Sequence, residues 1–350
     1  MTKKVMVAMS GGVDSSVAAA LLKKEGYSIT GITMCLGVKQ GDDETPSCCG
    51  PQAVSDARRV CDMLDIPHYV MDFSEALEKH VIQNFIDEYA AGRTPNPCVR
   101  CNRYLKFDIL LRKAQALGFD YFSTGHYAGV SDYNGDLVLS RPQDTTKDQT
   151  YFLYAVKKEA LPRLLFPLAS LDKATVRSLA RDEGLPVSDK EESQDICFVT
   201  GTSYREITGR MLQTTGNIVD CRGTVLGKHR GIGNYTVGQR KGLGIATGTP
   251  LYVVKIDPQK NAVIVGSKDD LGARKLVARD LNLFTEKIPP KLAAKIRYAH
   301  KAASCELTGH KGDMTVTFDM PQEAITPGQS IVFYDGNCML GGGIIDKVIP

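Results

Sequence analysis

The order of elements in the first two hundred residues constrains the fold of this chain more than any other feature. Short apolar runs alternate there with amphipathic stretches, and an Asn-Gly pair at 134–135 marks a hairpin inserted in the series. We expect strands at 5–9, 27–36, 68–71, 120–123, 129–133 and 137–140, and helices at 13–24, 52–64, 74–91, 105–117 and 173–182. Such alternation predicts an α/β fold with a Rossmann-like, doubly wound parallel sheet, in which ligands bind at the carboxyl ends of the strands.

The sequence changes character after about residue 204. A short helical stretch at 203–211 leads into glycine-rich, β-branched sequence. Further strands are expected at 251–256, 262–265, 314–318, 330–334 and 343–348. Short strands with frequent turns predict small β-domains that include a barrel. We therefore expect a catalytic domain at 1–204, a small central domain at 205–269 and a C-terminal β-barrel domain at 270–350.

Composition narrows the function classes. The 350 residues include 43 Lys and Arg against 40 Asp and Glu, a formal charge of +3, so any anionic partner must be met by a local patch. No apolar run reaches the ~18 residues of a membrane span, and no export signal is recognisable at the N-terminus. We therefore expect a cytoplasmic protein without a membrane partner. Its ten cysteines should be reduced thiols, for which reactive or metal-binding roles outrank structural disulfides.

The turn after the first strand has a specific composition, Ser-Gly-Gly-Val-Asp-Ser-Ser at 10–16. Two glycines allow a tight turn that aims successive N–H groups at one point, and the helix N-terminus adds its dipole. Hydroxyl donors come from Ser10, Ser15 and Ser16. The pattern is typical of a phosphate-binding loop, yet it is neither a Walker A loop nor the three-glycine dinucleotide fingerprint. The alternative is a tight turn whose polar side chains only cap the helix.

This loop resembles that of the pyrophosphate-loop ATP-pyrophosphatases, which bind ATP, adenylylate an oxygen of their substrate and release pyrophosphate. Members of that superfamily differ in substrate, so the loop alone does not identify one.

The ten cysteines differ in setting. Cys98 and Cys101 form a Cys-x-x-Cys between a proline turn and the helix expected at 105–117, with Arg100 and Arg103 nearby, so we expect lowered thiol pKa values and a nucleophile or ligand role. Taken alone, Cys197 among apolar neighbours is more typical of a buried small hydrophobe. The pair Cys48 and Cys49 lies in a polar loop and is open to redox, metal-binding or inert roles. The others have ordinary settings: Cys35, Cys61, Cys221, Cys305 and Cys338.

Six further motifs follow the loop in a recognisable order. They are Asn-Pro-x-Val-x-Cys-Asn at 96–102, Thr-Gly-His-Tyr at 124–127, Lys-Asp-Gln-Thr-Tyr-Phe at 147–152, Ser-Gln-Asp-Ile-Cys-Phe at 193–198, Gly-Gln-Arg-Lys-Gly-Leu-Gly at 238–244 and Thr-Pro-Gly-Gln at 326–329. From about residue 4 to 345 the chain thereby resembles the tRNA-specific 2-thiouridylases. These enzymes replace the C2 oxygen of the wobble uridine in certain tRNA anticodons with sulfur.

The resemblance implies a reaction that uses ATP and Mg²⁺, adenylylates uridine C2 and takes sulfur from a cysteine persulfide. Cys197 would carry the persulfide, delivered by a sulfur-relay protein or a cysteine desulfurase. Cys101 would be its catalytic partner, closing a Cys101–Cys197 disulfide as sulfur leaves. The products would be 2-thiouridine, AMP and pyrophosphate.

The resemblance also implies binding residues, position by position. The ATP site would comprise Ala8, Met9, Ser10, Gly11, Gly12, Val13, Asp14, Ser15, Met34 and Gly125. The target base would contact Asn96, Pro97 and Cys98. The tRNA anticodon region would contact His126, Lys147, Asp148, Gln149, Arg297, Tyr298 and Gln329.

One departure from the family pattern concerns Cys98, because many members have Asp there. Its absence puts a carboxylate proton shuttle at this position in doubt. It also creates a set of three cysteines with Cys101 and Cys197, which could hold an iron–sulfur cluster with one open iron, as in related tRNA-thiolating enzymes. We favour a spare thiol beside the persulfide pair over the cluster.

Two stretches without any acidic residue favour an RNA partner. Residues 221–256 and 287–305 contain only basic charged side chains, which suits phosphate neutralisation, although a solvated basic face is the alternative. A pyrophosphate-loop ligase acting on a small metabolite would use neither these stretches nor the cysteine pair. A non-catalytic zinc or RNA-binding protein is the other alternative, but the second ligand pair of a zinc site is missing.

Overall fold

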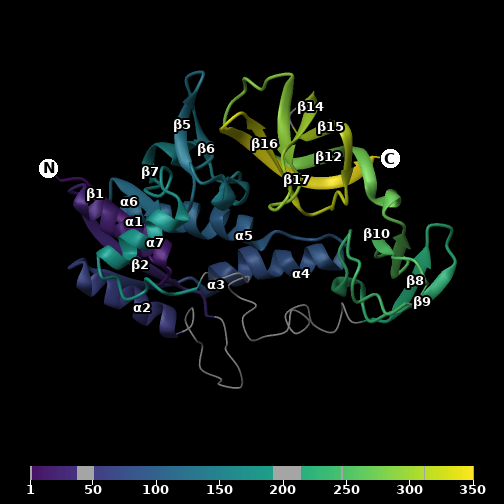
Figure 1. Cartoon of the computed structure of the whole chain (residues 1–350), viewed down its shortest axis with the longest axis horizontal. Coiled ribbons are helices and arrows are strands. Elements are labelled where there is room, and N and C mark those ends of the chain that lie inside the picture. Colours follow the sequence, from purple (N-terminus) through teal and green to yellow (C-terminus); the bar gives the residue numbers. More distant parts are fainter. Residues whose placement is uncertain (1, 38–50, 192–213, 246, 311, 350) are drawn as a thin grey trace.

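The computed structural model describes residues 2–37, 51–191, 214–245, 247–310 and 312–349 of the chain. Within these ranges the strands form three sheets. Figure 1 shows a parallel-sheet domain beside a β-barrel, with α4 (Gln83–Ala90) reaching toward the strands of a small central domain. The predicted fold class is confirmed: a Rossmann-like domain, a central domain and a C-terminal barrel.

The first sheet is parallel and has the order β3-β2-β1-β4-β7. Its strands are β1 (Lys4–Ala8), β2 (Ser28–Cys35), β3 (His68–Asp72), β4 (Tyr121–Thr124) and β7 (Leu164–Leu165). Since β1 pairs with β2 on one side and β4 on the other, the strand order reverses at β1. Ligands of doubly wound sheets bind at such a switch point, which here lies where β1 and β4 end.

Helices cover both faces of this sheet, as the alternation predicts. One face carries α1 (Val13–Lys24), α2 (Pro51–Met63) and α7 (Lys173–Asp182), packed on Val5 and Val7 of β1. The other carries α3 (Ser74–Leu77), a π-helical turn at Glu78–Ile82 and α4, packed on Met6. Neighbouring strand residues point to opposite faces, so a continuous apolar run such as Val5–Val7 serves both cores.

The helix expected at 105–117 begins earlier than predicted. It starts with α5 (Pro97–Arg100), continues as a π-helical segment at Cys101–Leu110 and ends with α6 (Leu111–Ala116). Asn96 is the N-cap, its side chain accepting from the Val99 N–H at 3.3 Å, and Pro97 takes the first helical position. Proline is favoured there because its fixed φ suits the helix and its missing N–H is not needed. Cys98 and Cys101 therefore lie within the helix, not before it.

The barrel closes within the described residues. Six antiparallel strands follow the order β12-β15-β14-β13-β16-β17, and β17 pairs back with β12. They are β12 (Gly272–Leu283), β13 (Lys291–Lys295), β14 (Ala303–His310), β15 (Asp313–Glu323), β16 (Ser330–Asp335) and β17 (Cys338–Ile349). The predicted hairpin is present as β5 (Gly129–Tyr133) and β6 (Asp136–Ser140), and it does more than interrupt the alternation. Its β6 pairs with β17, so the hairpin extends the barrel sheet.

The central sheet has the order β10-β11-β8-β9. Its strands are β8 (Gly216–Asp220), β9 (Val225–His229), β10 (Tyr252–Asp257) and β11 (Ala262–Gly266). The helix expected at 203–211 and the domain boundary near 204 lie outside the described residues, and the boundary near 270 stays a proposal. Among the helices that the structure describes, none has the length and apolarity to cross a membrane.

Candidate active site

The loop after β1 is shaped by close contact with two neighbouring segments. Gly11 has φ +70, and a Cβ atom there would lie 2.2 Å from the carbonyl oxygen of Ala53 in α2. A Cβ on Gly125, directly after β4, would lie 2.5 Å from the Ser15 nitrogen. Both positions therefore require glycine. The loop and the end of β4 meet at the switch point, where the resemblance implies that Gly125 lines the adenosine site.

The serine hydroxyls have a different use from the one expected. Ser15 and Ser16 are buried, and both hydroxyls donate to the Gly12 carbonyl, at 3.2 and 2.8 Å. Ser15 Oγ also accepts from the Ser10 backbone N–H at 3.2 Å. These hydroxyls thus hold the loop in shape. Ser10 is exposed, and its hydroxyl lies 3.1 Å from Ser15 Oγ. Gly12 caps α1 without a side-chain hydrogen bond among the described residues, which leaves first-turn N–H groups for an anion.

Two lysines that sequence reasoning missed lie against this loop. The Lys190 ammonium donates to the Gly11 carbonyl at 2.9 Å and to Asp56 Oδ2 at 2.7 Å. Burial opposes ionisation of Asp56, but hydrogen bonds from Lys190 and Gln52 outweigh it and hold the pKa of that carboxyl below its usual value. Asp56 is thus a buried anion that keeps the Lys190 ammonium at the mouth of the loop.

The second lysine is at the start of α7. Lys173 Nζ lies 2.6 Å from Asp14 Oδ1, which also accepts from the Tyr127 hydroxyl at 3.1 Å. Both lysines come from segments more than 150 residues after the loop, so no local motif marks them.

Two further residues predicted to bind ATP lie at the same edge of the sheet. Met34 is the penultimate residue of β2, and Ala8 ends β1. Both pack against the core cluster that contains Cys101. His126 follows Gly125, and its Nδ1 lies 2.7 Å from Thr124 Oγ1. Burial, with a smaller contribution from Lys106, holds the pKa of His126 well below its usual value, so its imidazole is neutral at pH 7.

The thiols on the helix do not have the lowered pKa values expected. Burial raises the pKa of Cys101, and the Lys106 ammonium only partly opposes this. The Cys98 side chain reaches solvent, yet desolvation by the surrounding protein raises the pKa of its thiol as well. The expectation was wrong because desolvation outweighs the helix N-terminus and the nearby cations. Arg100 and Arg103 are also turned elsewhere, to the His80 carbonyl and the Asp280 carboxylate.

Lys106 links the helix to the ATP edge of the sheet. The Phe107 ring of the same π-helical segment lies 5.8 Å from the His126 ring, and the Lys106 charge lowers the pKa of Cys98, Cys101 and His126 against other effects or with them. His126 adjoins Gly125, which contacts the loop. The structure thus brings the predicted ATP edge and the Cys98–Cys101 helix together. Cys197, Cys48 and Cys49 lie outside the described residues.

The other cysteines are mostly as expected. Cys61, Cys98, Cys101, Cys221, Cys305 and Cys338 are free thiols. Cys35 is disulfide-bonded, which corrects its assignment to the ordinary group and the expectation of reduced thiols at this position. The described residues contain no group of three His, Cys, Asp or Glu side chains that could hold a metal ion.

The residues at 147–149 lie where the catalytic domain meets the barrel. Asp148 is buried and accepts from the Thr150 N–H at 2.9 Å. Gln149 Oε1 accepts from the Tyr127 N–H at 2.9 Å. Thr150 in turn contacts the Tyr334 hydroxyl of the barrel at 3.0 Å. These side chains shape the interface, whereas their contact with tRNA stays a prediction.

Of the three barrel residues, only Tyr298 offers an exposed ring. Its side chain is 40% exposed, its ring centroid lies 4.6 Å from that of Phe152, and the Lys295 ammonium lies 5.6 Å away. This suits stacking on a base. Arg297 Nη2 is shared among the carbonyls of Val237 and Ala324, both at 2.8 Å, and a threonine hydroxyl. Gln329 donates to the backbone before Asn96.

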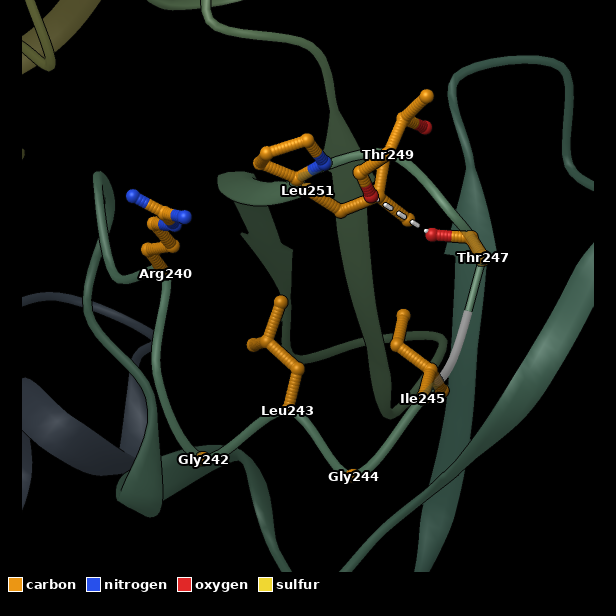
Figure 2. Close-up of a pocket in the computed structure, with 9 residues that line it drawn as sticks. Arg240, Gly242, Leu243, Gly244, Ile245, Thr247, Thr249 and Leu251 are labelled. Carbon is orange, nitrogen blue, oxygen red and sulfur yellow. Dashed lines mark hydrogen bonds between the residues drawn. The ribbon is translucent and has the colours of Figure 1, made fainter.

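A small hollow lies in the central domain, within the first acid-free stretch. Figure 2 shows Leu243 and Ile245 along one side, Arg240 at the edge and the hydrogen bond from Thr247 Oγ1 to the Thr249 carbonyl, at 2.9 Å. None of the predicted site residues lines this hollow.

Comparison with known proteins covers the whole chain. A tRNA methyl transferase HUP domain model matches residues 3–201, a tRNA methyl transferase PRC-barrel domain model matches 207–267, and an aminomethyltransferase beta-barrel domain model matches 273–345. The chain is 48% identical to tRNA-specific 2-thiouridylase MnmA 1 of Syntrophus aciditrophicus (strain SB), over 100% of this chain and 94% of that protein. It is 50% identical to the 2-thiouridylase MnmA of Carboxydothermus hydrogenoformans, over 99% and 98%.

The chain belongs to the tRNA-specific 2-thiouridylase family. The resemblance drawn from the motifs is therefore confirmed. Because the matches span both chains almost completely, the similarity of this 2-thiouridylase family member to its relatives is not limited to the loop domain. Neither a small-metabolite ligase nor a non-catalytic metal- or RNA-binding protein is favoured by these matches.

Proposed function

We propose that this chain is a tRNA-uridine 2-sulfurtransferase that adenylylates C2 of the wobble uridine and then transfers sulfur to it. The observation that supports this most is the continuity of the site. The loop at the end of β1 contacts Gly125, His126 follows, and the His126 ring lies 5.8 Å from the ring of Phe107 in the segment that begins with Cys101. A phosphate loop beside a pair of thiols suits a reaction that first activates an oxygen and then replaces it with sulfur.

ATP would be held by Gly11, Gly12 and the first turn of α1, with Met34 and Gly125 beside the adenosine. The loop suits a polyphosphate for two reasons. Gly11 has no room for a side chain, and the ammonium groups of Lys190 and Lys173 bond Gly11 and Asp14 of the loop. We infer that Lys190 and Lys173 bind the β- and γ-phosphates and stabilise the charge of the leaving pyrophosphate. A Mg²⁺ ion bound with ATP would neutralise further phosphate charge. Since no three metal-binding side chains converge in the described residues, phosphates and water would supply most of its ligands.

Adenylylation is needed because the C2 oxygen of uracil is a poor leaving group. Once it bears AMP, a persulfide on Cys197 attacks C2 and AMP departs. The Cys101 thiolate then attacks the Cys197 sulfur and releases 2-thiouridine, so that a Cys101–Cys197 disulfide forms. A thiol reductant must restore the pair before the next cycle. Because the Cys101 thiol has a raised pKa, its proton must be removed within the complex, and the neutral His126 is available in the same neighbourhood.

The uridine lies in a single-stranded loop and can turn into a pocket at modest cost. We propose Asn96, Pro97 and Cys98 as its contacts, and His126, Lys147 to Gln149, Arg297, Tyr298 and Gln329 as tRNA contacts. The sulfur donor would be a relay protein or a cysteine desulfurase. A reaction on tRNA that consumes ATP is expected to take place in the cytoplasm.

The test is an assay with purified protein, ATP, Mg²⁺, tRNA and a sulfur donor that measures pyrophosphate and 2-thiouridine separately. Cys101→Ser should lose thiolation by at least about a thousandfold yet keep tRNA-dependent pyrophosphate release, because only the second half needs the thiol. Lys190→Met should raise the KM for ATP about tenfold or more, since the hydrogen bond from the Lys190 ammonium to the ATP phosphates is lost. Lys158→Met, which removes an ion pair with Asp136 in the hairpin, is the matched control. The proposal would be refuted if pyrophosphate release had the same rate with and without tRNA.

The iron–sulfur alternative has its own readout in the same preparation. Protein purified without oxygen should lack brown absorbance and stoichiometric iron. Iron that disappears in Cys98→Ser would instead establish the cluster.

A further inference from the structure

The segment that joins α4 to α5, residues 91–96, is hydrogen-bonded to the barrel. The Thr94 N–H donates to the Pro327 carbonyl at 2.9 Å. Gln329 Nε2 donates to the carbonyls of both Thr94 and Pro95, each at 3.0 Å. The backbone of this connection is therefore held on its donor and acceptor sides by one turn of the barrel.

The approach is too close for any other residue in the middle of that turn. Gly328 has φ +91, and a Cβ atom there would lie 2.8 Å from both the nitrogen and the oxygen of Thr94. Beside it, the Arg93 guanidinium bonds Glu88 at 2.6 Å, the Asp346 carboxylate at 3.1 Å and the Ile345 carbonyl at 3.1 Å. Residues 93–95 are thus fixed by side chains and backbone from β17 and the turn before β16.

This segment leads directly into the helix that carries Cys98 and Cys101. Asn96 caps α5, Pro97 is buried at its first position, and Cys98 and Cys101 follow within a turn. A shift of the Pro95 carbonyl would move the cap and rotate both thiols. A misplacement of about 1 Å at reacting atoms can reduce a rate about a hundredfold. The contacts that the barrel makes with residues 93–95 should therefore affect the rate of the reaction.

We propose that Gln329 is a positioning residue, which fixes the start of the Cys98–Cys101 helix through its amide nitrogen. The amide can only be oriented this way, because both of its partners are carbonyl oxygens. Both of these bonds use Nε2, and Oε1 would accept from a hydroxyl of the tRNA when the tRNA binds. One side chain would then couple tRNA contact at the barrel to the placement of the thiols. The inference deepens the proposed thiolation and rests on it only for the turnover measurement.

The decisive experiment needs neither tRNA nor ATP. The tRNA-free protein is alkylated with iodoacetamide, and the rate at each cysteine is read by mass spectrometry. Cys101 is buried, so its rate reports opening of the helix start. Cys305 in the barrel and Cys61 in the parallel-sheet domain are also buried and report global opening. A residue that only contacts RNA would not change any of these rates.

Three substitutions separate the roles of the amide. Gln329→Met and Gln329→Glu both lack the donor and should raise the Cys101 rate at least about threefold with Cys305 and Cys61 unchanged. Gln329→His retains an N–H at similar reach and should restore the slow rate. Gln322→Met is the control, since among the described residues the Gln322 amide bonds only the Met320 carbonyl of the same barrel. In turnover, kcat for thiolation should fall about tenfold in the donor-lacking variants.

Two results would overturn the inference. An unchanged Cys101 rate in Gln329→Met and Gln329→Glu would leave Gln329 as an RNA contact alone. A parallel rise at Cys305 and Cys61 would make it a general stabiliser of the fold. Because alkylation does not depend on activity, either result is independent of whether the thiolation proposal holds.

Discussion

At the scale of single residues, burial decides the chemistry of the thiols. Cys98 and Cys101 are near a helix N-terminus and near Lys106, which would each favour the thiolate, but desolvation raises the pKa of both side chains. The free enzyme therefore keeps them protonated at pH 7. Such thiols are protected from oxidation and become reactive only when a base or substrate is in place.

The pH dependence of alkylation tests this directly. A raised pKa means that the thiolate fraction is small at pH 7 and grows about tenfold per pH unit until the pKa is passed. The rate at Cys98 in the tRNA-free protein should therefore keep rising from pH 7 to pH 9. The measurement is iodoacetamide modification resolved by mass spectrometry, with free cysteine as the reference. A rate that levels off below pH 8 would contradict the raised pKa.

At the scale of elements, the turn between β1 and α1 shows how one contact makes a binding loop. The left-handed backbone of Gly11 and the Ala53 carbonyl at its side leave no room for a side chain. The turn is consequently fixed between α2 and the buried hydroxyls of Ser15 and Ser16, and its amides are organised before any ligand arrives. Such preorganisation is what makes an anion site effective.

Gly11→Ala should therefore cost both stability and ATP affinity. The left-handed backbone alone costs about 1–2 kcal/mol for a non-glycine residue, and the clash with Ala53 adds to it. Gly26→Ala is the matched control, because Gly26 has φ +86 but no atom of the described part of the chain lies within 4 Å of a Cβ atom there. Thermal unfolding should show a larger loss for Gly11→Ala, and only that variant should raise the KM for ATP. Equal losses in both variants would exclude the steric role of Ala53.

At the scale of the whole molecule, the catalytic domain and the barrel share one hydrophobic core. Met6 and Phe122 of the parallel sheet belong to the same cluster as Phe284, Val332 and Tyr334 of the barrel. The barrel is thus part of the structure that surrounds the thiol helix. The net charge of +3 is likewise an average, because the two acid-free stretches lie in the central domain and the barrel.

If the first of these stretches binds tRNA, its contribution should depend on salt. Each phosphate contact of a single-stranded region contributes about −0.7 to the slope of log K against log salt, and of a duplex about −0.9. Arg240→Gln and Lys241→Gln should each reduce the slope by roughly that amount in tRNA filter binding. Lys260→Gln, on the turn between β10 and β11, should leave it unchanged. A slope that is the same in all four proteins would show that this face does not meet phosphate.

The sequence by itself determined the parallel sheet, the phosphate loop after β1 and the family, because these depend on periodicity and on residues that are adjacent in the chain. The roles that the resemblance implies for Gly125 and Cys101 stay predictions, and the helix that carries Cys101 begins earlier than the sequence pattern indicates. Tertiary structure decided the thiol pKa values, the lysines at the loop and the bonds of Gln329. Each of these depends on residues that are far apart in sequence. Lys190 bonds Asp56, and Pro327 and Gln329 bond the backbone of Thr94. Their energies arise only when folding removes water between them, and no local pattern encodes that.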